Sequence, residues 1–157
     1  MSVDSLIECV MNVSEGKEPE VIRRISDAIQ STHDCRLLHT WSDPDHHRTV
    51  ITFVGRGEQV AEGAFAGAAE AIQRIDLRRH RGVHPRIGAV DVVPFVPLGR
   101  VTMAEAVRIA RKFGARLARE LHLPVYFYGE AARSEERINL AHVRRGEKAS
   151  RRQSPRE

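Results

Sequence analysis

The sequence lacks long apolar runs, and no stretch reaches the roughly 18 apolar residues that a membrane-spanning helix needs. Its first ten residues, MSVDSLIECV, lack a basic segment followed by an apolar one, so we expect no secretory signal. There are two cysteines, Cys9 and Cys35, and neither belongs to a CxxC pair. This argues against a zinc ribbon or a CxxC redox motif and favours a reduced, cytoplasmic protein.

Several catalytic signatures are also absent. The sequence contains no GxGxxG or Walker loop, no GxSxG nucleophile elbow and no HExxH motif. Hydrophobic residues make up 41% and charged residues 29%, which is typical of a globular domain rather than a disordered chain. The length of 157 residues fits one domain with one core.

The net charge of +4 is unevenly distributed. The end of the chain, RRGEKASRRQSPRE, carries six Lys or Arg against two Glu, and the rest of the chain is close to neutral. We therefore expect residues 1–147 to form the domain and residues 148–157 to be a basic, disordered tail. The charge of the folded part indicates neither a nucleic-acid partner nor a membrane partner.

Hydrophobic periodicity predicts alternating strands and helices. The expected strands, rich in β-branched and aliphatic residues, are 6–13, 36–41, 48–54, 89–96 and 124–128. The expected helices are 19–32, 58–75 and 102–121, with a short one within 131–145. Pro94 places its strand at an edge or a bulge. This order predicts an α+β fold, a ferredoxin-like α/β sandwich in which helices pack mainly on one face of a mixed sheet.

The loop 78–86, RRHRGVHPR, contains four arginines and two histidines in nine positions. His80 and His84 have the i, i+4 spacing of zinc ligands on a helix, but Gly82 and Pro85 argue against a helix here. Histidine can exchange a proton near neutral pH, and the arginines could hold a carboxylate substrate. The spacing leaves two interpretations open, an acid–base site and a solvated basic loop.

The segment 42–48, SDPDHHR, has the composition of a metal cluster, with Asp43, Asp45 and His46 close together. Combined with His84 of the basic loop, it would suggest a metal-dependent hydrolase. A hairpin turn is the favoured interpretation, because Asp-Pro-Asp is ordinary turn chemistry. Arg48 begins the next strand, where its side chain could point into a cleft.

Two further candidates lie where expected strands end. Residues 12–16, NVSEG, follow the first strand, and Glu130 follows the last. Strand ends often line binding sites. Asn, Ser and Gly also make turns, so the sequence does not decide between a site and a turn.

Five segments occur in an order that resembles a known family: ECVMNVSEG, SDPDHHRTVITFVG, IDLRRHRGVHPRIGAVDVVPFVPL, PVYFYGEAA and NLAHVRRGE. Together they resemble the N-terminal subdomain of glutamate formimidoyltransferase, which in animals is part of formimidoyltransferase-cyclodeaminase. The resemblance runs from about residue 6 to residue 147. HRGVHPRIGA is its most diagnostic part.

The resemblance implies a ferredoxin-like transferase of histidine catabolism and one-carbon metabolism. Such an enzyme moves a formimino group from N-formimino-L-glutamate to its co-substrate tetrahydrofolate, and no metal is expected. The family's catalytic histidine falls on His84, which would take the proton from folate N5 and then protonate the departing glutamate. Asn12 would line the same cleft. From their charge and placement, we expect Arg48 and Arg86 to bind the substrate carboxylates, and we expect His80 to help to bind the substrates.

The sequence departs from the family pattern at several positions. Met11 and Val13 replace Pro and Phe, His47 replaces Asn, and Val83 replaces a Glu beside His84. Full transferases have a second subdomain that supplies much of the site. We therefore expect either an enzyme that acts with a separate C-terminal-subdomain chain or as a homo-oligomer, or a non-catalytic paralogue that binds folate or a partner.

Overall fold

The computed structural model describes residues 5–79 and 87–145. His80, His84 and Arg86 therefore lie outside the described residues. The chain divides into two compact units, Met1–Ala110 and Arg111–Glu157. Within the described ranges, no helix is both long and apolar enough to cross a membrane.

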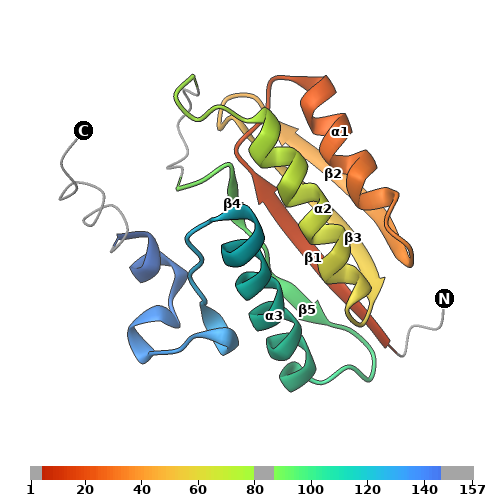
Figure 1. The fold of residues 1–157 in the computed structure, drawn as a ribbon, viewed down its shortest axis with the longest axis vertical. Helices are drawn as coiled ribbons and strands as arrows, with labels where there is room; N and C mark the ends of the chain where they lie inside the picture. Colours follow the sequence, from red (N-terminus) through yellow and green to blue (C-terminus); the bar gives the residue numbers. More distant parts are fainter. Residues whose placement is uncertain (1–4, 80–86, 146–157) are drawn as a thin grey trace. The chain divides into compact units, whose positions relative to one another are not determined.

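The first unit is built on an antiparallel sheet (Figure 1). Its strands are β1 (Leu6–Val13), β2 (Cys35–Asp43), β3 (Arg48–Arg56), β4 (Val90–Val92) and β5 (Phe95–Pro97). The order is β2-β3-β1, with β4 and β5 both paired to β1. Helix α1 (Pro19–Gln30) connects β1 to β2, and α2 (Gln59–Arg74) follows β3. This β-α-β-β-α-β arrangement confirms the predicted ferredoxin-like α+β sandwich.

One face of the sheet is covered by helices, as Figure 1 shows for α1 and α2 lying side by side. A Cβ atom added at Gly67 of α2 would lie 2.8 Å from Ile29 of α1 and 3.4 Å from the sulfur of Met11. The small residues of α2 thus let two helices and the sheet approach closely. Every second residue of β1 is fully buried on this face: Ile7, Cys9, Met11 and Val13.

The opposite face of the sheet, which we call the open face, carries the alternate residues. The register aligns Asn12 with Val50, and Val50 with Trp41 on the edge strand β2. Trp41 is 47% exposed. Val96 of β5, aligned with Glu8, is 39% exposed. The open face therefore presents exposed apolar side chains on its β2 and β5 strands.

The predicted strand 89–96 is present but interrupted. It forms β4 and β5, and the backbone N–H of Val10 donates to the carbonyl of Pro94 between them at 3.4 Å. Proline has no N–H to offer the sheet, so the strand lies at an edge and breaks there, as predicted. The register also shifts between Asn12 and Val13, which indicates a β-bulge opposite them in β4.

Helix α3 (Met103–Leu121) begins with the capping box expected from the sequence. The N–H and hydroxyl of Thr102 donate to the carboxylate of Glu105, and the Glu105 N–H donates back at 3.2 Å. Residues 140–145 are helical, in agreement with the predicted short helix.

The predicted strand 124–128 is wrong, because the structure assigns no strand to these residues. Within the second unit, Val125 and Phe127 instead pack against α3, where a Cβ added at Gly114 would lie 2.7 Å from the Phe127 ring. The guanidinium of Arg133 stacks 5.0 Å from the centre of the same ring. A pattern of aromatic and β-branched residues indicates a half-buried extended segment, but a strand also needs a pairing partner.

Candidate functional site

The turn that follows β1 joins segments far apart in the sequence. Ser14 is 2% exposed, and its hydroxyl donates to the carbonyl of Gly88 at 2.7 Å. Its backbone N–H donates to the carbonyl of Ala89 at 2.8 Å. Gly88 and Ala89 come just after the basic loop and just before β4. The carboxyl end of β1 is therefore attached to the point where the chain returns from that loop.

Glu15 places a buried carboxylate in this turn. The residue is 2% exposed, and its Oε1 accepts the backbone N–H groups of Gly16, Lys17 and Glu18 at 2.9, 2.8 and 3.1 Å. These amides precede α1 and have no partner in the helix itself. The carboxylate thus holds the connection between β1 and α1 in one conformation.

The β2–β3 hairpin is attached to the same turn through His47. This side chain is buried, and its Nδ1 accepts the N–H of Gly16 at 3.0 Å, while Glu15 Oε1 lies 3.4 Å away. Accepting this hydrogen bond requires a lone pair on Nδ1, so the geometry fits the imidazole protonated on Nε2. Thr49 adds a second attachment, because its hydroxyl donates to the Glu15 carbonyl.

Asn12 and Arg48 are brought together by the strand register. Asn12 is aligned with Val50, and Arg48 lies two residues earlier on the same face of β3. Diagonal neighbours of this kind are about 7–8 Å apart. Asn12 is 9% exposed and its Nδ2 donates to the Val10 carbonyl, while the Nε atom of Arg48 is shielded from solvent. Two predicted binding residues therefore share one end of the open face.

Asp91 is a candidate that the sequence analysis missed. It is the extra residue of the bulge, because Asn12 is aligned with Val92 and Val13 with Val90. Bulges often re-aim side chains beside functional sites. The available signal was an acidic residue within the apolar run AVDVV.

The turn interpretation of the hairpin tip is confirmed. Asp43 Oδ1 accepts the N–H groups of Asp45 and His46, both at 3.0 Å, and Oδ2 lies 2.6 Å from the His46 Nδ1. The His46 amide is the main cause that lowers the pKa of Asp43 below its usual value. In the described part of the chain, no three His, Cys, Asp or Glu side chains are grouped to hold a metal ion. Glu130 lies in the second unit, in a short 3₁₀ helix, Gly129–Ala131.

Comparison with known proteins identifies the family. Residues 6–156 match the model of the formiminotransferase domain, N-terminal subdomain. The chain belongs to this family. The predicted relationship is thereby confirmed for nearly the whole sequence.

Three relatives show how much of a longer protein this family member covers. It is 55% identical to the formimidoyltransferase-cyclodeaminase of Sus scrofa, over 92% of this chain and 27% of the relative. It is 48% identical to the glutamate formimidoyltransferase of Thermoplasma acidophilum, over 89% of this chain and 46% of the relative. It is 40% identical to the glutamate formimidoyltransferase of Streptococcus pyogenes, over 90% of this chain and 48% of the relative. The chain thus spans between about a quarter and a half of the length of these relatives.

Proposed function

We propose that this chain supplies the N-terminal half of a formimidoyltransferase site. The reaction is the transfer of a formimino group from N-formimino-L-glutamate to tetrahydrofolate. Family membership carries this proposal, together with the relatives named glutamate formimidoyltransferase. The meeting of Asn12 and Arg48 at one end of the open face supports it.

His84 is proposed as the general acid and base. Folate N5 attacks the formimino carbon and gives its proton to the imidazole, and the bond from that carbon to the glutamate nitrogen then breaks. The imidazolium returns the proton to the departing nitrogen, so the histidine ends the cycle unchanged. Three residues separate His84 from Gly88 in the sequence. The bond from Ser14 to Gly88 supports the proposal, because it joins the end of β1 to the chain just after the loop that carries His84.

The remaining residues are proposed to bind the substrates. Arg48 suits a substrate carboxylate, because guanidinium groups bind carboxylates with two parallel hydrogen bonds. Arg86 would take a second carboxylate, and His80 would add a donor beside it. The side-chain amide of Asn12 would orient the reacting group.

The proposed enzyme needs a second subdomain or subunit to complete the cleft. The open face supports this, because Trp41, two strands from Asn12 in the register, and Val96, aligned with Glu8, expose apolar surface on it. Apolar surface that adjoins polar site residues is typical of an interaction surface. We place the C-terminal subdomain of the transferase on this face.

Complementation tests the proposal. The purified chain is titrated with a separately produced C-terminal subdomain while the emission of Trp41, the single tryptophan, is recorded. We expect a blue shift as the indole is covered, together with formation of 5-formiminotetrahydrofolate. Folate binding without turnover at saturating C-terminal subdomain would instead identify a non-catalytic paralogue. If the chain shows no folate binding and no turnover, both proposed functions are contradicted.

A further inference from the structure

Arg48 lies between two residues that are both attached to the turn after β1. His47 accepts the Gly16 N–H, and the Thr49 hydroxyl donates to the Glu15 carbonyl. Both side chains are buried, whereas strand alternation sends the Arg48 side chain to the open face. The backbone of Arg48 is therefore held on both sides by the buried side chains of its two neighbours, which lie away from the open face.

Gly16 shows how closely the two segments approach. A Cβ at this position would lie 2.6 Å from the Arg48 nitrogen and 2.4 Å from the Asp43 oxygen. Both are backbone atoms that cannot rotate away. The contact thus allows no side chain at position 16. Across it, the Gly16 N–H donates to His47 Nδ1 at 3.0 Å, and it also donates to Glu15 Oε1 at 2.9 Å.

His47 adopts an unusual backbone conformation to make this bond. Its φ is 53°, in the left-handed region that few residues other than glycine adopt. Such strain persists only where the surroundings compensate for it. Here the compensation comes from burial of the ring and from the bond between its Nδ1 and Gly16.

We propose that His47 is a positioning residue that sets the direction of Arg48 toward the substrate carboxylate. The imidazole acts as a hydrogen-bond acceptor and takes no part in proton transfer. Loss of the acceptor would free the hairpin end and widen the range of Arg48 orientations. This inference rests on the proposed function, because it assigns the formiminoglutamate carboxylate to Arg48.

A purely structural role makes different predictions. If His47 only stabilised the fold, its removal would reduce the active fraction and leave both Michaelis constants unchanged. A positioning role instead raises KM for formiminoglutamate and leaves KM for tetrahydrofolate unchanged. Replacement of His47 by Asn also separates the two roles. Asn carries the acceptor Oδ1 on Cγ, in the place where His carries Nδ1. Asn also tolerates a positive φ, so His47→Asn keeps the acceptor in place.

The test uses His47→Ala, His47→Asn and, as a matched control, His46→Ala in the complemented enzyme. His46 is the exposed neighbour in the same hairpin. We expect His47→Ala to raise KM for formiminoglutamate about three- to tenfold, the effect of one lost hydrogen bond. His47→Asn and His46→Ala should stay near the parent value. In the Arg48→Lys background, His47→Ala should cause little further increase in KM for formiminoglutamate, because both changes affect the same contact. Equal effects on both KM values, or multiplicative effects with Arg48→Lys, would overturn the proposal.

A spectroscopic measurement separates this proposal from the proposed function. The Arg48 Nε–H is shielded from solvent and should give its own resonance in a ¹H–¹⁵N spectrum. We expect the resonance to broaden or disappear in His47→Ala and to persist in His47→Asn. An inactive parent would contradict the transferase, and the resonance would still decide the positioning role. An unchanged resonance in His47→Ala would overturn it.

Discussion

The hydroxyl of Ser14 and the carbonyl of Gly88 lie 2.7 Å apart, across 74 positions of sequence. This bond connects the end of β1 to the point where the chain returns from the basic loop. The residues on the two sides of the contact belong to different predicted motifs, NVSEG and RRHRGVHPRIGA. The candidate site is therefore assembled by the sheet and not by any one segment.

Replacement of Ser14 by alanine should impair the reaction more than the fold. The backbone bond from Ser14 to Ala89 remains, so we expect a loss of about 1 kcal/mol in unfolding free energy. Because the loop that carries His84 loses an anchor, kcat should fall severalfold. Ser26→Ala removes another buried hydroxyl, on α1, and should leave kcat unchanged. Steady-state kinetics and urea unfolding check both expectations. Equal kcat values for the two variants would contradict the anchoring role.

Gly16 and Gly57 should respond differently to alanine. At Gly57, φ is 47° and a Cβ would meet nothing within 4 Å, so only backbone strain of about 1–2 kcal/mol is expected. At Gly16 the Cβ would overlap the Arg48 and Asp43 backbones, so the loss should be several kcal/mol. Urea unfolding of both variants measures the difference. A Gly16→Ala variant as stable as Gly57→Ala would mean that the hairpin is not fixed against the turn.

The two cysteines should be unreactive in the folded protein. Burial is the main cause that raises the pKa of Cys9 well above its usual 9.0, and burial raises the pKa of Cys35 to about 11. At pH 8 the reactive thiolate of Cys35 is then about one part in a thousand. We expect a disulfide reagent to label both thiols rapidly in urea and very slowly in buffer. Rapid labelling of the native chain would contradict the burial of both side chains.

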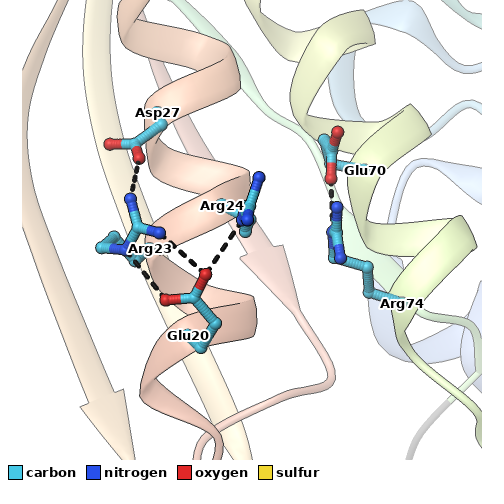
Figure 2. A network of polar contacts seen from close by, with 6 residues as sticks. All are labelled: Glu20, Arg23, Arg24, Asp27, Glu70 and Arg74. Atoms are coloured by element: carbon cyan, nitrogen blue, oxygen red, sulfur yellow. Dashed lines mark hydrogen bonds and ion pairs between the residues drawn. The ribbon is translucent and has the colours of Figure 1, made fainter.

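The outer surface of α1 should contribute to stability at neutral pH and lose that contribution in acid. Glu20 receives hydrogen bonds from Arg23 and Arg24 (Figure 2), which lower its pKa from the usual 4.5 to about 2. A carboxylate with a lowered pKa stabilises the fold above pH 4.5, and this effect disappears as pH falls toward 2. The pair is exposed, so the effect is small and weakened by salt. Unfolding free energy measured from pH 5 to 2 should fall less steeply in Glu20→Gln. Identical slopes would show that these ion pairs contribute nothing.

Local features of the fold could be predicted from the sequence because local chemistry specifies them. The Thr102–Glu105 capping box spans four residues. The Asp43 carboxylate accepts the N–H of Asp45, two residues later in the same turn. The interruption at Pro94 follows from a missing N–H. Each of these features depends on neighbours that are adjacent in the sequence.

Features that depend on distant partners could not be predicted. Nothing in NVSEG indicates that Glu15 meets His47, because their contact requires β1 and β3 to pair in one register. The absence of a strand at 124–128 has the same origin, because the side chains of this segment pack against a helix and the segment has no strand partner. Asp91 became a candidate only when the bulge beside Asn12 was known.

The most direct test of the proposed role of His84 is the turnover rate of His84→Ala in the complemented enzyme. The fluorescence titration of Trp41 shows in the same sample whether the two subdomains have assembled. General acid–base catalysis typically contributes 10²–10⁴-fold, so we predict a fall in kcat of at least about a hundredfold with unchanged assembly. A His84→Ala variant that assembles and retains the parent kcat would contradict the assignment of the reaction to this loop.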